Sequence, residues 1–468
     1  MLAKLDTNKV FIINRSELEG RVDPIYYNYK KTLFINFKHP LEKLGNSFII
    51  KDGDHDKLPS DSISNFEDGK RYLRAQDLKD NQLSNENPVY ITEEYFNKVT
   101  RCHIYPGDLL LSIMASIGAS AIVPYDYPIC TSNRAIGILR LKNNSMFIPD
   151  YVQILISTNI GFSLFEIEKK GGIQQRLNLA DISNVKLPAP PFQIQQQIVE
   201  LYHAATTTKQ QKETQAKILL DSMDTHLISE LGITLPSKSS TAKNKIFTVN
   251  FSDTLGSRLD PVFYNADLGH FSKGLYPMKP LNKIINSLKS GIGAGKQDQA
   301  LNGNGIIQVR PTNMDENREL DFTKNVYLPF DSKYELLEPD DVLFNNTNSQ
   351  ELVGKTVIYK GGQPLTYSNH ITVIKVKKEV LVPEYLWLIL NLFQKHKIFY
   401  SMCTNWNNQS GVGIELLNTI AIPLPPLEIQ NQIVSYLQFI REQARQLRAE
   451  AESLLEEAKK EVEILILG

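Results

Sequence analysis

Apolar and polar positions alternate most regularly after Pro426. There, apolar residues recur at alternating spacings of four and three positions, and Glu, Gln, Arg and Lys fill the positions between them. Such a spacing, sustained over three heptads, predicts a helix whose apolar seam packs against another helix. We therefore predict one helix over 427–467, about 60 Å long at 1.5 Å per residue. The predicted seam consists of Ile433, Leu437, Ile440, Ala444, Leu447, Ala451, Leu454 and Ala458.

A second segment, 192–231, repeats this pattern less cleanly. Polar residues interrupt the middle of its seam, which we predict as Ile194, Ile198, Leu201, Ala205, Thr208, Lys212, Gln215 and Leu219. One alternative is that each helix covers only its own domain. A seam of this length exceeds what one small domain can cover, so we expect the two helices to pair with each other.

The remaining sequence mixes short strand patterns with apolar helical stretches. The segments 341–346, 355–360 and 370–376 are rich in β-branched residues and bounded by Gly, Pro and Asn, which is typical of strands. The stretches 150–167 and 384–402 are apolar over helical lengths, and Pro precedes each, so each predicts one helix. This combination indicates a compact α+β fold.

The whole pattern occurs twice along the chain. Seven pairs of matching segments keep the same order, at separations between 233 and 237 residues. RVDPIYYN from Arg21 matches RLDPVFYN from Arg258, and LPAPPFQIQQQIV ending at Val199 matches LPLPPLEIQNQIV ending at Val434. Other pairs are KVFIINRSE and KIFTVNFSD, YLRAQDL and IQVRPTNM, YPGDLLLS and EPDDVLFN, TSNRAIGIL and YSNHITVIK, and PDYVQILI and PEYLWLIL. Collinear matches of this number predict a tandem duplication.

The duplication divides the chain into domains and helices. A short polar segment, SKSSTAKNK from Ser237, lies between the halves and suits a linker. We predict domains at 1–190 and 245–425, a first helix with the start of the linker at 191–236, and a second helix at 426–468.

Charge and cysteine content exclude several classes. The chain has 51 Lys and Arg against 52 Asp and Glu, a net charge of -1, which excludes a polybasic tail but not local basic surfaces. Cys102, Cys130 and Cys403 show no CxxC spacing, so neither a disulfide framework nor a structural zinc cluster is expected. The N-terminal segment lacks the apolar stretch of a signal peptide, and no apolar run approaches the roughly 18 residues of a membrane span. We expect a soluble cytoplasmic protein.

Motifs that suggest catalysis lack essential parts. APPF at Ala189 has no polar first residue to bind a target amino group, and SGIGAGKQ at Ser290 lacks the phosphate-loop spacing and its Ser or Thr. DGDHDKLPSD from Asp52 has no recognised metal-ligand spacing. PDD at Pro339 lacks the further residues of a metal-dependent nuclease. We predict no catalytic residue and no metal site in this chain.

Binding chemistry remains, in polar residues between the strand-like segments. Arg, Gln and Asn are the side chains that read base edges through paired hydrogen bonds. Each of them also suits an ordinary turn, and recurrence in two copies strengthens the binding interpretation only modestly. The candidates are Arg74, Gln76, Asn133 and Arg134 in the first copy, and Gln308, Arg310, Asn313, Asn346, Asn348, Asn369 and His370 in the second.

The arrangement resembles the specificity subunit of type I restriction-modification systems. The resemblance is carried by the two Pro-Pro helix starts, by DGDH with RYLRAQDL, by YPGDLLLS and by EPDDVLFNNTNSQELVGK. It covers nearly the whole chain, although the second copy has SGIGAGKQ where the first has DGDH.

This resemblance implies a division of labour. Each α+β unit would be a target recognition domain that reads one half of a split, asymmetric site in double-stranded DNA. The helices would pair antiparallel, set the spacing and dock methyltransferase subunits. Those partners would hold S-adenosylmethionine, and restriction or translocase subunits would use ATP and magnesium. The helix residues expected in docking are Ile198, Leu201, Leu219, Ile433, Leu437, Ile440, Leu447 and Leu454.

Two other classes stay open. A two-domain scaffold that binds protein would fit the near-zero net charge, and an enzyme with an unfamiliar site is a further alternative. Salt dependence of DNA binding separates the first two, because counterion release gives a steep slope only to proteins that bind phosphates.

Overall fold

The computed structural model describes most of the two repeated halves. The described residues are 37–65, 68–114, 118–168, 177–234, 274–300, 303–331, 333–406 and 409–467, with Asn14, Arg15, Tyr27 and Thr248. Apart from those single residues, four repeated segments lie outside this set: KVFIINRSE, KIFTVNFSD, RVDPIYYN and RLDPVFYN. The predicted linker lies outside it as well. Within it, no helix is both long and apolar enough to cross a membrane.

The chain forms two compact units. Unit 1 comprises residues 1–213 and 447–468, and unit 2 comprises residues 214–446. Each unit therefore contains one repeated α+β domain and one end of each long helix. This confirms the predicted α+β duplication.

Unit 1 is built from short elements in chain order. They are β1 (Leu41–Lys43), α2 (Leu44–Ser47), β2 (Phe48–Asp52), η2 (Ser60–Ser62), β3 (Ile63–Ser64), β4 (Lys70–Leu73), η4 (Ala75–Asp77), β5 (Leu78–Lys79), β6 (Gln82–Leu83), β7 (Val89–Ile91), α3 (Glu93–Lys98), η5 (Thr100–Cys102), β8 (Leu109–Ser112), β9 (Ser120–Ile122), β10 (Thr131–Ser132), β11 (Ile136–Leu141), α4 (Pro149–Ser157), α5 (Asn159–Glu168), α6 (Leu179–Asn184), β12 (Lys186–Pro188) and α7 (Phe192–Leu231).

Unit 2 repeats most of this order. Its elements are β13 (Met278–Pro280), α10 (Leu281–Ile284), β14 (Ile285–Ser290), η8 (Lys296–Asp298), β15 (Ile306–Val309), η10 (Pro311–Asn313), β16 (Tyr327–Leu328), β17 (Val342–Asn345), β18 (Thr347–Asn348), β19 (Thr356–Ile358), β20 (Leu365–Tyr367), β21 (Ile371–Val376), α11 (Pro383–Lys395), α12 (Ile398–Met402), β22 (Thr404–Trp406), β23 (Gln409–Gly411), α13 (Ile414–Thr419), β24 (Ala421–Pro423) and α14 (Leu427–Leu467).

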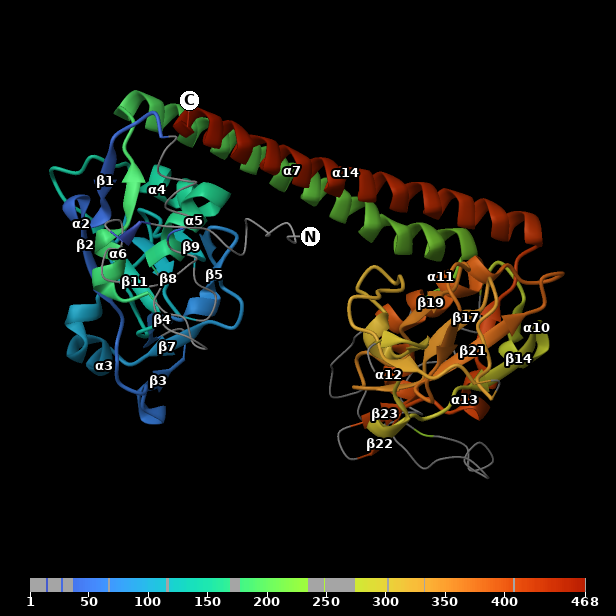
Figure 1. Cartoon of the computed structure of the whole chain (residues 1–468). Coiled ribbons are helices and arrows are strands. Elements are labelled where there is room, and N and C mark those ends of the chain that lie inside the picture. Colours follow the sequence, from blue (N-terminus) through green and yellow to red (C-terminus); the bar gives the residue numbers. More distant parts are fainter. Residues whose placement is uncertain are drawn as a thin grey trace. The chain divides into compact units, whose positions relative to one another are not determined.

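Three sheets of unit 1 have counterparts in unit 2. The antiparallel sheet β2-β11-β8-β9 of unit 1 matches β14-β21-β17-β19 of unit 2 (Figure 1). A second sheet, β10-β4-β7-β3, matches β20-β15-β16, and the pair β1-β12 matches β13-β24. The predicted strands at 341–346, 355–360 and 370–376 are β17, β19 and β21, in agreement with their β-branched patterns.

A buried glutamine fixes the start of each long helix after its Pro-Pro pair. In unit 1, Gln195 accepts a hydrogen bond from the Ile148 amide at 2.8 Å and donates to the Met146 and Pro190 carbonyls. In unit 2, Gln430 makes the same three bonds, to Val382, Val380 and Pro425. Both side chains are fully buried, so the helix start and the neighbouring loop are held as one piece.

The two apolar stretches predicted as single helices are each divided in two. In unit 1 the Thr158 hydroxyl accepts a hydrogen bond from the Gly161 amide at 3.1 Å, which begins α5 one residue after α4 ends. In unit 2, Lys397 has a left-handed backbone with φ of 61°, and it separates α11 from α12. The prediction of one helix was wrong in both units, because apolar composition does not reveal such breaks.

The long helices pair with each other in both units. In unit 1, Ile198 near the start of α7 shares a core with Val462 near the end of α14. In unit 2, Leu227 near the end of α7 shares a core with Ile433 near the start of α14. The start of each helix thus meets the end of the other, and the helices are antiparallel (Figure 1). Their bounds, Phe192–Leu231 and Leu427–Leu467, are the predicted ones.

The seam of α14 follows the prediction, and that of α7 departs from it in the middle. Ile433, Leu437 and Ile440 are at most 6% exposed. In α7, the predicted seam residue Gln215 is exposed, and Ala216 is buried in its place. The physical reason is that an α-helix has 3.6 residues per turn, so the buried face of the helix shifts gradually away from a strict seven-residue repeat.

The helix residues predicted to bind a partner lie along this seam. Ile198, Ile433, Leu437 and Ile440 are buried, and Leu201, Leu219, Leu447 and Leu454 are half-buried. Because they pack within the chain, a docking protein would have to contact the other faces of the helices.

Candidate nucleic-acid interface

Each unit contains a pair of short parallel strands whose carboxyl ends meet. In unit 1, β4 pairs with β10, and the Asn133 amide donates a hydrogen bond to the Leu73 carbonyl at 3.1 Å. In unit 2, β15 pairs with β20, and the Ser368 amide donates to the Val309 carbonyl at 3.0 Å. Since both strands of a pair run in one direction, the residues that follow them lie together. We call this place the strand-end edge of each unit.

Most of the predicted binding residues gather at the strand-end edges. Arg74 and Gln76 follow β4, while Asn133 and Arg134 follow β10. In unit 2, Gln308 lies at the end of β15, Arg310 and Asn313 follow it, Asn369 and His370 follow β20, and Asn346 and Asn348 lie at β17 and β18. The parallel pairing therefore brings together residues that the sequence separates widely.

One glycine per unit allows a loop to pass close to this edge. A Cβ at Gly53 would lie 2.1 Å from the Asn133 carbonyl oxygen, and a Cβ at Gly291 would lie 2.2 Å from that of Tyr367. Neither distance is sterically possible, so both positions require glycine. The segments DGDH and SGIGAGKQ, which differ in sequence, thus occupy corresponding places and share this glycine.

The strand register corrects the sequence alignment of the repeats by one residue. Ser132 pairs with Leu73 in unit 1, whereas Tyr367 pairs with the corresponding Val309 in unit 2. The matching Ser-Asn dipeptides therefore do not occupy equivalent positions. By register, Arg134 corresponds to Asn369.

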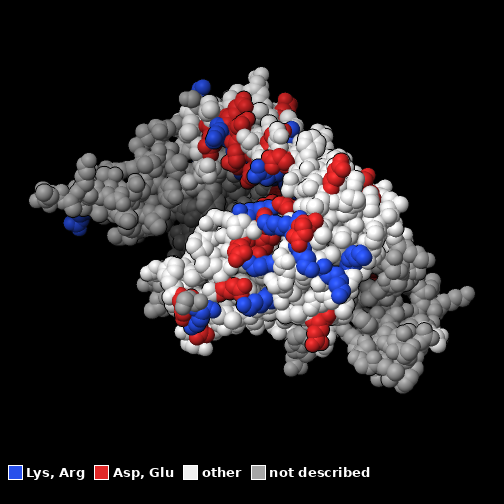
Figure 2. Space-filling model, turned by 90° about the vertical axis from the view of Figure 1, so that its right-hand side faces the viewer, with Lys and Arg blue, Asp and Glu red and all other residues white. Residues whose placement is uncertain are grey.

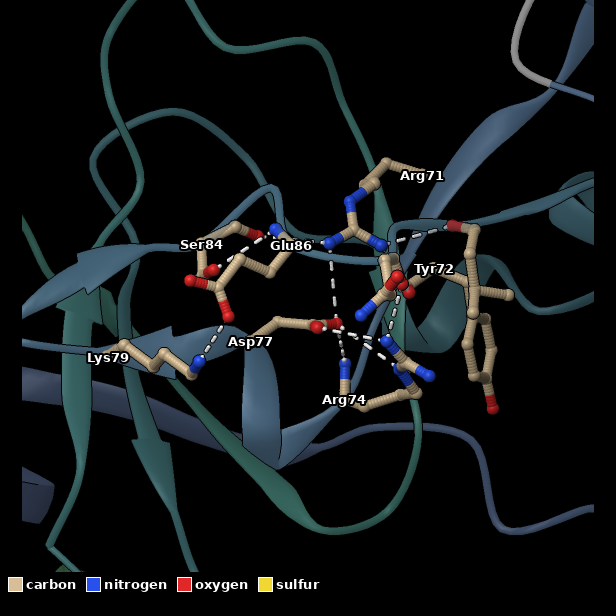
Figure 3. A network of polar contacts seen from close by, with 9 residues as sticks. Arg71, Tyr72, Arg74, Asp77, Lys79, Ser84 and Glu86 are labelled. Carbon is tan, nitrogen blue, oxygen red and sulfur yellow. Dashed lines mark hydrogen bonds and ion pairs between the residues drawn. The ribbon is translucent and has the colours of Figure 1, made fainter. Parts of the chain in front are cut away.

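Arg74 is held within unit 1 by a buried carboxylate. Its Nη2 donates to Asp77 Oδ1 at 3.1 Å and to the Asn87 carbonyl at 2.8 Å. Asp77 is 1% exposed and also pairs with the buried Arg71, at 3.4 Å. Figure 3 shows both guanidinium groups converging on Asp77. With its amide oriented to satisfy both groups, Gln76 also accepts hydrogen bonds from Arg74. The guanidinium of Arg74 is engaged inside the domain.

Arg310 occupies the equivalent position in unit 2 with neutral neighbours. Its Nε donates to Gln308 Oε1 at 3.0 Å, and its Nη2 donates to the Ala294 carbonyl at 3.1 Å. Asn313 stands where unit 1 has Asp77, and its Oδ1 accepts from the Arg310 backbone amide at 3.0 Å. Among the described residues, no carboxylate forms an ion pair with Arg310. Burial lowers the pKa of this guanidinium, as expected for a cation partly removed from water without a counter-charge.

A polar hollow of about 930 Å³ opens at the strand-end edge of unit 2. Five predicted residues line it: Gln308, Arg310, Asn348, Asn369 and His370. Other polar residues around it are Thr312, Lys324, Asn325, Thr347, Ser349, Ser368 and Gln409. Thr347 and Ser349 belong to the polar run NNTNSQ and could have been included on that ground. Nothing in the sequence pattern pointed to Lys324, Asn325 or Gln409, which the fold brings in from other segments.

Three of the predicted residues are buried and hydrogen-bonded inside unit 2. Asn313 is 1% exposed, and its amide donates to the carbonyls of Asp321 and Lys324. Asn346 is 7% exposed and donates to Thr372 Oγ1 at 2.8 Å. Gln308 is fully buried, although it is among the residues that line the hollow. These positions argue against direct base contacts by Asn313 and Asn346, because their polar groups already have partners.

The acidic loop of unit 1 is tied to its own domain. Tyr95 donates its hydroxyl to Asp54 at 2.5 Å, and Asp52 accepts from Arg101 at 2.9 Å and contacts His55 at 2.5 Å. Among the described residues, no three His, Cys, Asp or Glu side chains come together as they would around a metal ion. These acids brace the loop that passes the strand-end edge.

Elsewhere on unit 2, opposite charges are interspersed. Lys375 lies 2.7 Å from Glu338, Lys378 lies 2.6 Å from Asp340, and Lys289 pairs with Glu335. On the face of the molecule that Figure 2 shows, basic and acidic residues alternate over short distances and form no broad basic patch. At the strand-end edge of unit 2, by contrast, Arg310 forms no ion pair with any described residue.

The comparison with known families bears on both repeats. The model of the type I restriction modification DNA specificity domain matches residues 50–219 and again residues 281–453. The two matches fall on the two repeats and cover well over half of the chain. The chain belongs to this family.

Known members of the specificity family are similar over part of their length. A putative type I restriction enzyme MjaX specificity subunit of Methanocaldococcus jannaschii is 29% identical over 181 residues, 37% of this chain and 41% of that protein. The type I restriction enzyme EcoBI specificity subunit of Escherichia coli is 23% identical over 193 residues, 41% of this chain and 38% of that protein. The matched region thus spans about two fifths of these curated relatives.

A similarity of fold to a solved structure extends over nearly the whole chain. A chain from a solved structure, described as the structural basis of complex assembly and conformational transition of the type I R-M system, matches with a TM-score of 0.55. The match covers 92% of this chain and 98% of that chain at 16% identity, so it supports the fold alone.

Proposed function

We propose that this chain is the sequence-specific DNA-recognition subunit of a type I restriction-modification complex. Each unit would read one half of a bipartite target in double-stranded DNA. The paired helices α7 and α14 would set the spacing between the half-sites and dock methyltransferase subunits.

The observation that carries this proposal is the polar hollow at the strand-end edge of unit 2. Its lining combines the Arg310 guanidinium with the amides of Asn348 and Asn369, the side chains that read base edges. Lys324 adds a cation suited to a phosphate. The double match to a family described by DNA specificity supports the same function for both units.

The chemistry of the complex would reside in other subunits. We expect this chain to bind no cofactor, while modification subunits hold S-adenosylmethionine and restriction or translocase subunits use ATP and magnesium. On the helices, exposed Tyr436 and Phe439 lie outside the seam and offer apolar contacts to such partners. The complex would act in the cytoplasm.

A second candidate function is a two-domain scaffold that binds protein and not DNA. It is favoured by the paired Lys and acidic residues on the face of unit 2 and by the net charge of -1. The two functions differ in how binding responds to salt.

The decisive experiment is selection from a library of randomised duplex DNA. The full chain would be co-expressed with a modification subunit of the same restriction-modification system and used to capture duplexes. A two-part motif with a fixed gap, and affinity that falls steeply with salt, is the expected result. Absence of any enriched motif, with affinity independent of salt, would favour the scaffold.

The spacing role of the helices has its own test. One heptad inserted into both helices at matched levels would keep the seam and add about 10 Å at 1.5 Å per residue. Because DNA rises about 3.4 Å per base pair, the preferred gap should lengthen by about three base pairs. A folded double-insertion variant that keeps the original gap would show that the helices do not set it.

A further inference from the structure

We propose that each unit reads a guanine with one arginine that has no carboxylate partner, and that the two arginines follow different strands of the equivalent parallel pairs. In unit 1 this residue is Arg134, after β10, and in unit 2 it is Arg310, after β15. Arg74, although equivalent to Arg310, positions the loop of unit 1 and reads no base. This inference rests on the proposed function and assigns its specificity to particular side chains.

The first step concerns Arg74, whose hydrogen-bonding capacity is used inside the domain. Asp77 receives both its Nε, at 3.4 Å, and its Nη2, at 3.1 Å. The Asn87 carbonyl accepts from Nη2 as well, and the reoriented Gln76 amide oxygen accepts from Nη1 and Nη2. To contact a base, Arg74 would have to leave a carboxylate that is 1% exposed and shared with Arg71. Leaving a buried charge without its partner is strongly unfavourable.

The second step concerns Arg310, whose guanidinium is oriented but not neutralised. The bonds from Nε to Gln308 and from Nη2 to Ala294 fix the plane of the group. Gln308 is itself fixed, because its Nε2 donates to the Ile292 carbonyl at 3.0 Å. Among the described residues, none accepts a hydrogen bond from Nη1 of Arg310, and the side chain lines the polar hollow. A donor fork held in this way suits the O6 and N7 acceptors of guanine.

The third step concerns Arg134, which in unit 1 has a fixed backbone and a side chain without an acidic partner. Its backbone is fixed, since its amide donates to the Asp54 carbonyl at 2.7 Å and its neighbour Asn133 caps the Ala135 amide at 3.2 Å. Its side chain is exposed, and within the described part of the chain no acid pairs with it. The anchored backbone places a free guanidinium at the strand-end edge of unit 1.

The strand register relates the two arginines. Arg134 corresponds to Asn369, and Arg74 corresponds to Arg310. Among the described residues, each edge therefore presents one guanidinium without a carboxylate partner. It follows the second strand of the parallel pair in unit 1 and the first strand in unit 2. Asp77 in one unit and Asn313 in the other account for the exchange, because only the carboxylate neutralises the arginine beside it.

The test substitutes lysine for each arginine in the full chain, co-expressed as above. Arg310→Lys and Arg134→Lys keep the positive charge but lose the two-pronged donor geometry that recognises guanine. Each should lower the preference for guanine at one position, in different half-sites, by roughly 5- to 150-fold, the equivalent of one paired base contact. The matched variant Arg74→Lys should leave every base preference unchanged.

The possible results distinguish failure of this inference from failure of the proposed DNA recognition. If the unaltered chain enriches no motif, the proposed DNA recognition fails. If it enriches a two-part motif that Arg310→Lys and Arg134→Lys both retain, or if Arg74→Lys alone changes a base preference, the assignment of the arginines is overturned. A uniform change in affinity for all sequences would identify a phosphate contact instead and would also overturn it. Because Arg134 is exposed, its substitution preserves folding and keeps the test available if an Arg310 variant fails to fold.

Discussion

Gln195 in unit 1 and Gln430 in unit 2 make the same three hydrogen bonds, whereas Arg74 and Arg310, at equivalent strand ends, have different partners. Other hydrogen bonds between helices and neighbouring segments also agree between the two units. Tyr151 and Tyr385 each donate a hydroxyl hydrogen bond at 2.8 Å, to the Pro188 and Pro423 carbonyls. The bonds that hold helices to sheets are therefore kept in both units, and the groups at the strand-end edge have changed.

The ion pairs made by buried carboxylates of the main sheets follow the same rule. Asp108 pairs with Arg140 at 2.7 Å in unit 1, and Asp341 pairs with Lys375 at 3.3 Å in unit 2. The carboxylate is retained and the cation is exchanged for another cation. At the edge, by contrast, Asp77 gives way to the neutral Asn313, which removes a charge. A change of charge beside an arginine alters what that arginine can bind, so the comparison distinguishes framework from recognition.

Removing the charge of Asp77 should have the largest effect on stability. Asp77→Asn makes unit 1 resemble unit 2 and leaves buried Arg71 without its counter-charge, so the free energy of unfolding should fall by about 3–5 kcal/mol. Urea unfolding measures it. The control, Asp80→Asn, alters an exposed residue with φ of 49°, a conformation that Asn tolerates, and should change stability by less than about 0.5 kcal/mol. Equal behaviour of the two variants would contradict the role given to Asp77.

The framework glutamines should have the next largest effect, and it should be the same in both units. Gln195→Ala and Gln430→Ala each leave one backbone amide and two carbonyls without partners in a buried site. We expect each to lower the free energy of unfolding by about 2–4 kcal/mol. Gln432→Ala, on an exposed position of α14, is the matched control. A large loss from only one of the two glutamines would break the equivalence of the units.

The glycines at the strand-end edges should respond alike despite their different sequence contexts. Gly53→Ala and Gly291→Ala place a Cβ against a carbonyl oxygen, and overpacking of this kind costs about 1–3 kcal/mol. In Gly293→Ala the new Cβ would approach Asn369 Oδ1 only to 3.6 Å, an ordinary contact, so that variant should be nearly neutral. Thermal unfolding of the three variants checks this. A tolerated alanine at Gly291 would mean that the two loops do not pass the edge in the same way.

The helix seam should show the smallest difference. In unit 1 the half-buried Lys212 of α7 pairs with Glu450 of α14 at 2.6 Å. In unit 2 the contact between the two helices includes apolar residues such as Leu227. Since both charged groups remain partly exposed, Lys212→Ala should cost at most about 1 kcal/mol, and less at high salt. Lys217→Ala, on an exposed position of α7, is the control. A loss that does not depend on salt would show that packing, and not charge, matters at Lys212.

The sequence by itself determined the duplication, the α+β class and the bounds of both long helices. The reason is that these features follow from the spacing and order of residues along the chain. Three local patterns are sufficient to recognise them: an apolar spacing of three and four, a Pro-Pro helix start, and a repeated order of segments. The sequence also named part of the strand-end edges, because polar residues that follow strand patterns can be recognised without knowledge of the fold.

Only the tertiary structure decided which partners those residues have. Arg74 and Arg310 are alike in sequence context, yet one faces a buried carboxylate and the other lines a hollow to which Lys324 and Gln409 contribute from distant segments. The burial of Asn313 and the register that equates Arg134 with Asn369 likewise depend on pairing between strands far apart in the chain. The partners of a polar side chain come from such long-range packing, which periodicity along the chain does not contain.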